Sequence, residues 1–185
     1  MNHTYVIDLF TQPGYDSPVR PLQSAFVSYE LVKRAYENVL PKITKIIEQD
    51  SVPGLSIVVL DPARPYSHMV KTTGIGAEIH ALPDAILYHT NMGNPETWRK
   101  FDHFALGKAL VCWVFEENSG DIERTRHRKG DCSYPGGIIH HGVVVAVSGH
   151  PHGEVDEEIG YLLADEIYRI VLVEYESHEQ PAFFK

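Results

Sequence analysis

One glycine-rich stretch in the C-terminal half restricts the folds open to this chain more than any other segment. Residues 136–149 read Gly-Gly-Ile-Ile-His-His-Gly-Val-Val-Val-Ala-Val-Ser-Gly. Residues 138–140 and 143–148 are rich in β-branched side chains, and the pair His141-Gly142 between them accepts the positive φ angles of a tight turn. We therefore predict that this stretch forms a β-hairpin.

The spacing of apolar residues changes directly after the hairpin. From Asp156 onward they recur every three or four residues, which is typical of an amphipathic helix. These apolar residues are Ile159, Leu162, Leu163, Ile167, Ile170 and Val171. The pattern predicts a helix that packs back on the hairpin.

The N-terminal half contains a helical pattern followed by two strand patterns. Apolar residues within 31–47 have helical spacing, and Pro41 among them either kinks one long helix or begins a second one. Residues 55–60 form a continuous apolar run too short for a helix, so we expect a buried strand. Residues 66–73 alternate in polarity and predict a second, antiparallel strand.

The middle of the chain mixes clear and ambiguous patterns. Residues 74–91 fit either a long surface loop or a loop that contains a short strand at 85–88. The capping residue Asn94, followed by a proline, predicts a helix that extends to at least residue 109. Residues 110–115 are apolar on all sides and fit a continuation of this helix or a strand.

The predicted elements define the fold class. Helices that flank a mostly antiparallel sheet form an α/β fold of the α+β sandwich type. Residues 1–21 contain three prolines and a glycine but few apolar pairs, so we expect an N-terminal arm that lies on a surface. Residues 22–185 are then predicted to form a single domain.

Several of these segments resemble the GlcG/HbpS-like family. The hairpin, the acidic run from Asp156 to Glu158 and the apolar helix look like the C-terminal half of that family. The family also includes a domain appended to some corrinoid adenosyltransferases and was once labelled haem-degrading. Residues 55–61 are similar to its first strand, and residues 98–109 to its middle helix. The resemblance covers residues 38–175 and implies a profilin-like fold, a small-molecule or haem ligand, and a homo-oligomer.

Composition restricts the partners. With 16 basic and 25 acidic side chains the net charge is −9, which disfavours nucleic acid as a partner. No apolar run approaches the roughly 20 residues needed to cross a bilayer, and no basic region precedes an apolar one at the N-terminus. We expect a soluble cytoplasmic protein without a membrane partner. Its two cysteines are expected to be free, with Cys112 buried and Cys132 in a loop.

The middle helix carries one group of candidate ligand-binding residues. Arg99, Lys100 and His103, with Trp98 nearby, fit a cationic, aromatic-edged surface for an anionic ligand. The alternative is that Trp98 and Phe101 fill the core while the polar residues contact water, as in any amphipathic helix.

The hairpin segment carries a second group. Gly136 and Gly137 permit close approach of the backbone to a ligand or neighbour, or serve a turn. His140 and His141 are adjacent, so if both have strand geometry their side chains point to opposite sides of the sheet. One of the two is then a candidate for a pocket, and the other is expected to be solvated at the turn; His140 is counted among the candidate ligand-binding residues.

The eleven histidines raise the question of a metal site. His150, His152 and Glu154 alternate along the chain, and in an extended conformation their side chains share one face and suit a divalent ion. The intervening proline and glycine disfavour that conformation, and ordinary surface residues are the alternative.

The basic cluster of residues 124–129 is the other charged feature. It fits an anionic ligand, an acidic patch on another subunit, or simple solvation.

Three classes of function remain open. The first is a small-molecule or haem-binding homo-oligomer, as the resemblance implies, with haem and a divalent metal as the cofactor candidates. The second is an enzyme that acts on a small anionic or aromatic substrate through histidine acid/base chemistry. The third is a non-catalytic assembly or adaptor protein. The sequence contains no phosphate-binding loop, nucleophile elbow or Cys-x-x-Cys pair to select a reaction.

Overall fold

The computed structural model describes residues 26–62 and 85–177. The arm predicted for residues 1–21 and the strand predicted for residues 66–73 lie outside the described residues. The described elements are α1 (Tyr29–Gln49), β1 (Gly54–Leu60), β2 (Ile86–Gly93), α4 (Pro95–Phe115), the short 3-10 helix η2 (Arg124–Arg126), β3 (Gly137–His140), β4 (Val143–Ser148) and α5 (Gly153–Glu176).

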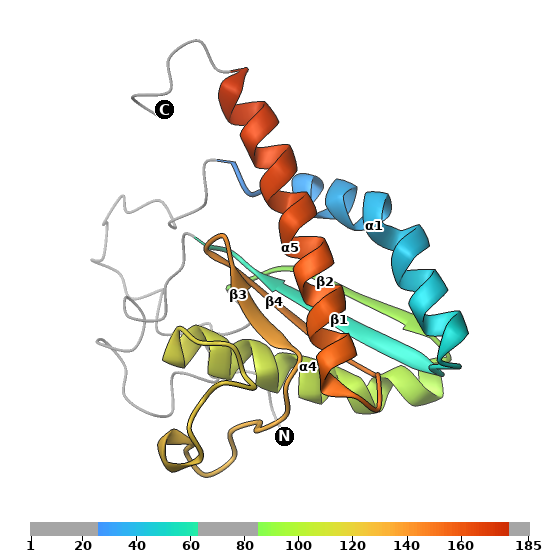
Figure 1. The fold of residues 1–185 in the computed structure, drawn as a ribbon, viewed down its shortest axis with the longest axis vertical. Helices are drawn as coiled ribbons and strands as arrows, with labels where there is room; N and C mark the ends of the chain where they lie inside the picture. The colour runs from blue at the N-terminus through green and yellow to red at the C-terminus, as the bar shows by residue number, and fades with distance from the viewer. Residues whose placement is uncertain (1–25, 63–84, 178–185) are drawn as a thin grey trace, which may run out of the picture.

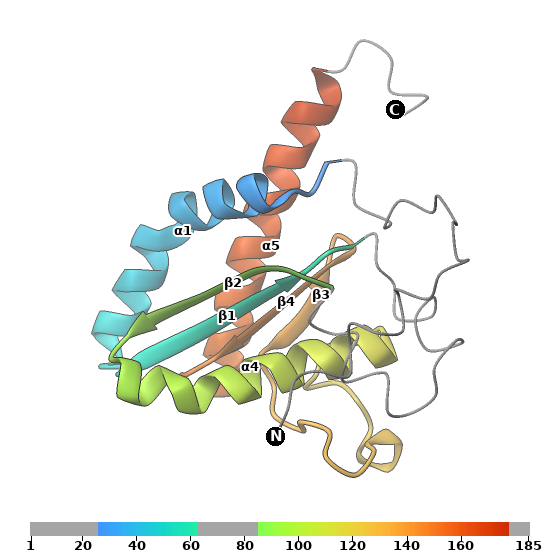
Figure 2. The same ribbon diagram turned by 180° about the vertical axis from the view of Figure 1, so that it is seen from behind.

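The four described strands form one antiparallel sheet in the order β2-β1-β4-β3. Helices α1 and α5 cover one face of this sheet, and α4 covers the other (Figures 1 and 2). The predicted α+β sandwich is therefore confirmed. No helix in the described ranges has the length and apolar character needed to cross a membrane.

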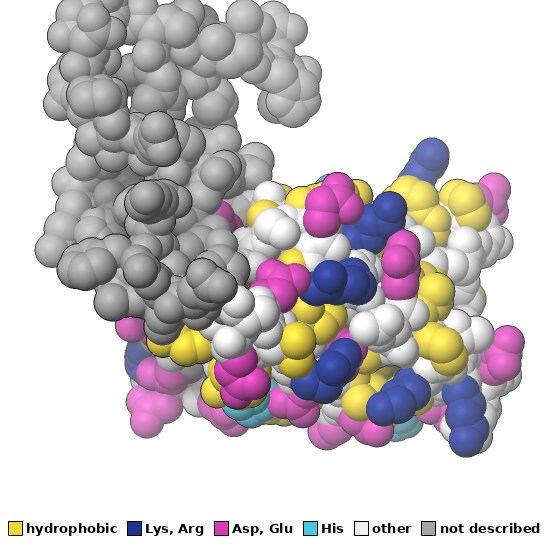
Figure 3. Space-filling model, turned by 90° about the horizontal axis from the view of Figure 1, so that it is seen from above, with side chains coloured by type: hydrophobic (Ala, Val, Ile, Leu, Met, Phe, Trp, Pro, Cys, Tyr) yellow, Lys and Arg dark blue, Asp and Glu magenta, His cyan; other side chains and the backbone are white. Residues whose placement is uncertain are grey.

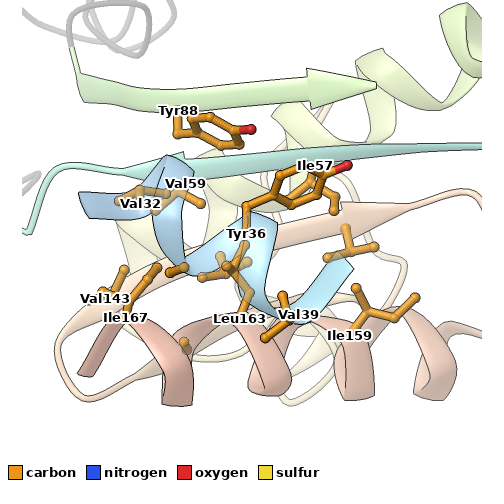
Figure 4. Packing of buried hydrophobic residues seen from close by; sticks show 14 of the residues in the cluster. Val32, Tyr36, Val39, Ile57, Val59, Tyr88, Val143, Ile159, Leu163 and Ile167 are labelled. Carbon is orange, nitrogen blue, oxygen red and sulfur yellow. The ribbon is translucent and has the colours of Figure 1, made fainter. Parts of the chain in front are cut away.

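The core follows from the alternation of side chains along the central strands. All seven residues of β1 are buried because the strand lies between two others and is covered on both faces. Ile57 and Val59 face α1 and α5, where Tyr36 and Leu163 lie close to them (Figure 4). Val58 belongs to the separate cluster beneath α4.

The hairpin forms as predicted. Ile138 pairs with Val145 and His140 with Val143. His141 and Gly142 have φ angles of 51° and 78°, the positive pair that a two-residue turn of this kind requires.

The structure decides the three local ambiguities. Pro41 lies inside one continuous helix, so a second helix does not begin there. The segment around residues 85–88 contains a strand, β2. Helix α4 continues through residues 110–115 and ends at Phe115, and its C-cap residue Glu116 has a φ of 55°. Its first turn is capped as predicted, since the Asn94 side chain accepts a hydrogen bond from the Glu96 amide at 2.9 Å.

Candidate functional site

A cavity of about 200 Å³ lies between α4 and the loop that connects β4 to α5. Its lining combines aromatic side chains, prolines and a few polar groups. The lining residues are Phe101, Phe104, Lys108, Tyr134, Pro135, Ser148, Gly149, His150, Pro151, Gly153 and Asp156. The cavity thus brings together the middle helix and the segment around residues 136–152, the two regions that the sequence indicates.

A buried ion pair borders the cavity. The Lys108 ammonium lies 2.9 Å from Asp156 Oδ2, and the two side chains are 3% and 2% exposed. Lys108 Nζ also donates to the carbonyl of Val147 at 2.7 Å, and Asp156 Oδ1 accepts from the His150 amide at 3.0 Å. Burial raises the pKa of Asp156, although Lys108 opposes this shift through its charge and its hydrogen bond. Both charges are therefore paired and hydrogen-bonded, as buried charges must be.

Gly136 explains how a lysine of α4 reaches α5 on the other face of the sheet. Its φ is +115°, and a Cβ atom there would lie 2.5 Å from Lys108 Nζ and 2.7 Å from the Val147 carbonyl oxygen. At Gly137 a Cβ would lie 2.6 Å from Cys112 Sγ. Within the chain, both glycines thus permit a close approach to α4 and to the ion pair, at the point where β3 begins. Ligand binding by Gly136 and Gly137 stays a prediction.

The residues predicted to hold a metal lie at the start of α5. The His150 side chain is 3% exposed, and its Nε2 lies 3.1 Å from Asp50 Oδ2. Its Nδ1 accepts from the His152 amide at 3.0 Å, and the two imidazole rings are 5.5 Å apart. Glu154 is exposed in the first turn of α5. These contacts tie His150 to the ends of two helices, and metal binding by His150, His152 and Glu154 stays a prediction.

The candidates of the middle helix lie beside the cavity and not in its lining. Arg99, Lys100 and His103 are exposed, and Trp98 is half-buried near Gly54. Phe101 and Lys108 line the cavity from the same helix. Ligand binding by Trp98, Arg99, Lys100 and His103 therefore stays a prediction.

Two arginines of the basic cluster are paired within the chain. Arg126 contacts Glu117 at 2.5 Å, and Arg128 contacts Asp131 at 3.1 Å. Their guanidinium carbons lie 5.2 Å and 5.7 Å from the centre of the Phe115 ring.

On the face seen in Figure 3, acidic and basic side chains of the described residues are interspersed. That face therefore offers no continuous basic track for a phosphate backbone.

Ser56, His89 and Asp102 meet beneath α4, an association between three elements that the sequence did not indicate. Asp102 Oδ1 accepts from Ser56 Oγ at 3.0 Å and lies 2.6 Å from His89 Nε2. Ser56 Oγ also lies 3.4 Å from His89 Nε2, so the same ring nitrogen faces both the hydroxyl and the carboxylate. In a nucleophilic relay the imidazole instead contacts the nucleophile through one ring nitrogen and the carboxylate through the other. Ser56 is also fully buried. The contacts between Ser56, His89 and Asp102 therefore connect β1, β2 and α4, and the buried Ser56 hydroxyl is not available to a substrate as a nucleophile.

Comparisons with known proteins support the fold. No family model matches the chain, and no curated protein matches it. The structure is similar to the crystal structure of Klebsiella pneumoniae protein ORFY, of family DUF336, with a TM-score of 0.52 and 15% sequence identity. The match covers 82% of this chain and 96% of that chain. The likeness shows the fold. DUF336 is the GlcG-like family, so the structural neighbour belongs to the group that the hairpin and its following helix resemble.

Proposed function

We propose that this protein is a small-molecule-binding protein of the GlcG/HbpS-like type, with its ligand in the cavity between α4 and the start of α5. The observation that carries the proposal is the combination of exposed aromatic rings and buried hydrogen-bonding groups around one hollow. Ligand sites are usually hollows lined by apolar and aromatic side chains, with a few polar groups that orient the ligand.

The aromatic part of the lining supports a ring-containing ligand. Phe104 and Tyr134 are 43% and 60% exposed, although both are large and aromatic. Their rings are 5.6 Å apart at an interplanar angle of 86°, an edge-to-face pair. A planar ligand that covers these rings would remove apolar surface from water, which is favourable.

The polar part of the lining supports an oxygen acceptor on that ligand. Ser148 contributes a hydroxyl group to the lining. The Lys108 ammonium has three N–H groups, of which two are directed at Val147 and Asp156. A carbonyl or carboxylate oxygen would accept from the remaining groups.

The size of the cavity favours a compact molecule. Its volume of about 200 Å³ is smaller than the roughly 300–1,000 Å³ of pockets that enclose drug-sized ligands. Haem is larger than such a cavity, so a single-ring ligand is the better fit. Hemin titration tests the haem alternative, because a Soret band that weakens when His140 or His150 is replaced would favour haem.

Benzoate and its neutral analogue benzamide are suitable probes, with binding followed by amide chemical shifts. Both should shift the signals of residues 148–153. Phe104→Ala should weaken both probes by removing a ring contact, and Ser148→Ala should weaken them by removing the hydroxyl. Tyr175→Ala is the matched control, since Tyr175 is 42% exposed and does not line the cavity. Unchanged spectra with both probes, or equal effects of the control variant, would contradict the proposal.

Self-association is the second part of the proposal, and the apolar surface of α5 supports it. Tyr168, Leu172 and Val173 are 39%, 39% and 58% exposed on the C-terminal half of this helix. Exposed apolar groups gathered on one element are typical of protein contacts. We expect light scattering to report an oligomer that Val173→Glu weakens and Phe104→Glu does not. A wild-type monomer would remove this part of the proposal.

A further inference from the structure

Two histidines and an aspartate form a compact cluster at the end of β4 remote from the cavity. In the described part of the chain, His140, His141 and Asp165 place one potential ligand atom each within 4.8 Å of one another. His140 Nε2 lies 2.9 Å and His141 Nε2 3.2 Å from the same oxygen, Asp165 Oδ1. Two imidazole nitrogens thus converge on one carboxylate.

The hairpin turn explains why adjacent histidines point in the same direction. In a continuous strand, neighbouring side chains lie on opposite faces of the sheet. His140 ends β3, but His141 is the first turn residue and has a left-handed φ of 51°, a conformation in which His is several-fold enriched. The two ring centres are consequently only 3.9 Å apart. The expectation that His141 would point away from His140 holds for strand geometry and fails at the turn.

Aromatic residues of α5 hold both imidazoles in place. The His141 ring stacks on Tyr168 at 3.9 Å with an interplanar angle of 11°. The His140 ring meets Tyr161 edge-to-face at 5.1 Å. Asn118 donates to the Tyr161 hydroxyl at 3.0 Å and accepts from the Ile139 amide at 2.8 Å. The rings are therefore positioned by their surroundings before any ligand arrives, which lowers the cost of binding one.

We propose that His140, His141 and Asp165 bind a first-row divalent metal ion, with zinc as the reference ion. Zinc bonds to imidazole nitrogen and carboxylate oxygen at about 2.0–2.2 Å, so tetrahedral ligand atoms are about 3.3 Å apart. The observed separations of 2.9 Å and 3.2 Å need to open by only a few tenths of an ångström. The aspartate side chain is 63% exposed, so water has access to complete the coordination.

The charges of the cluster agree with this assignment. Imidazoles that bind a metal do so in their neutral form, so this ligand set would contribute one negative charge, from its carboxylate. A bound divalent ion would leave a net charge of +1. Two imidazoles with one carboxylate and an open position is a ligand set found for zinc and for iron. The site is independent of the cavity, since none of its three residues lines the cavity.

Calorimetric titration of zinc into the metal-stripped full chain tests the proposal. We expect one tight ion per chain, and at least about tenfold weaker binding in His141→Ala and in Asp165→Ala. His152→Ala is the control, because it removes an exposed imidazole from the other group of histidines and should leave the affinity unchanged. Wild-type affinity in His141→Ala, or loss of binding in His152→Ala, overturns the assignment.

A second measurement locates the ion without relying on affinity. Paramagnetic Co²⁺ should broaden the amide signals of residues 139–142 and 161–168, and circular dichroism should confirm that each variant is folded. Broadening confined to residues 150–154 would place the ion at the start of α5 and refute the proposal.

Discussion

Replacing Lys108 by methionine should destabilise the protein by about 4 kcal/mol. The ammonium donates to Asp156 at 2.9 Å and to the Val147 carbonyl at 2.7 Å, with both charged side chains almost fully buried. Hydrogen bonds to charged groups contribute about 1.5–3 kcal/mol each, so two give about 3–6 kcal/mol. Removal of one partner of a buried ion pair independently costs about 3–5 kcal/mol, and the two ranges overlap near 4 kcal/mol.

A double variant, Lys108→Met with Asp156→Asn, distinguishes the loss of the ion pair from the cost of leaving one buried charge without a partner. Asp156→Asn keeps an oxygen that can accept from the His150 amide, a bond that an apolar replacement would lose. Added to Lys108→Met, it removes the uncompensated carboxylate. We expect the double variant to be about 2 kcal/mol more stable than Lys108→Met alone, since neutral replacements of buried pairs are often tolerated.

Urea unfolding followed by circular dichroism measures these differences, and an unchanged m-value shows that the same surface unfolds. The exposed pair Lys33–Glu37, 4.0 Å apart, provides the control, and Lys33→Met should leave the midpoint unchanged. A loss below about 1 kcal/mol in Lys108→Met would refute the reasoning from burial. Additive effects of the two substitutions would show that the side chains do not act as a pair.

Three other predictions concern backbone, thiols and pH. Gly136→Ala should lower the free energy of urea unfolding more than Gly130→Ala does. Both glycines have a positive φ, but of the two only Gly136 has atoms within 4 Å of where a Cβ would lie. Equal losses in the two variants would contradict the steric explanation. Burial raises the pKa of Cys112 to about 12, so a disulfide reagent should react quickly with Cys132 alone, and Cys132→Ser should abolish the fast phase. Burial raises the pKa of Asp156 in the folded state above the ordinary value of 3.8. The Asp156 contribution to the free energy of unfolding is therefore fully present below pH 3.8 and is lost as pH rises through the raised pKa. Unfolding measured as a function of pH should show this decline in the wild type and not in Asp156→Asn.

The hairpin and central strand were predictable because their signals are local. The turn residues His141 and Gly142 and the β-branched runs beside them specify the pairing without distant contacts. The residues of β1, apolar except for Ser56, likewise indicate a strand covered on both faces. Residues 110–115 were ambiguous because Val111, Cys112 and Trp113 are all buried, which removes the polar face that distinguishes a helix.

The candidate cavity was predictable by region but not by residue. Lys108 and Asp156 are 48 residues apart and come together only because Gly136 lets the chain pass close to α4. A lysine within an otherwise apolar helical stretch was the available signal, since a buried lysine requires a partner. His140 and Asp165 likewise meet only once α5 has packed on the hairpin.

The hairpin also determines how the two proposed sites relate to each other. Ser148 lines the cavity at one end of β4, and Val143 pairs with His140 at the other end, about 17 Å away for a strand of this length. All six residues of β4 are buried between β1 and β3, so the strand offers little freedom to transmit a rearrangement. Phe104→Ala should therefore leave zinc affinity unchanged within twofold while it weakens benzoate. A larger change in zinc affinity would mean that the hairpin has a second arrangement, and that the cavity and the histidine cluster are energetically coupled through it.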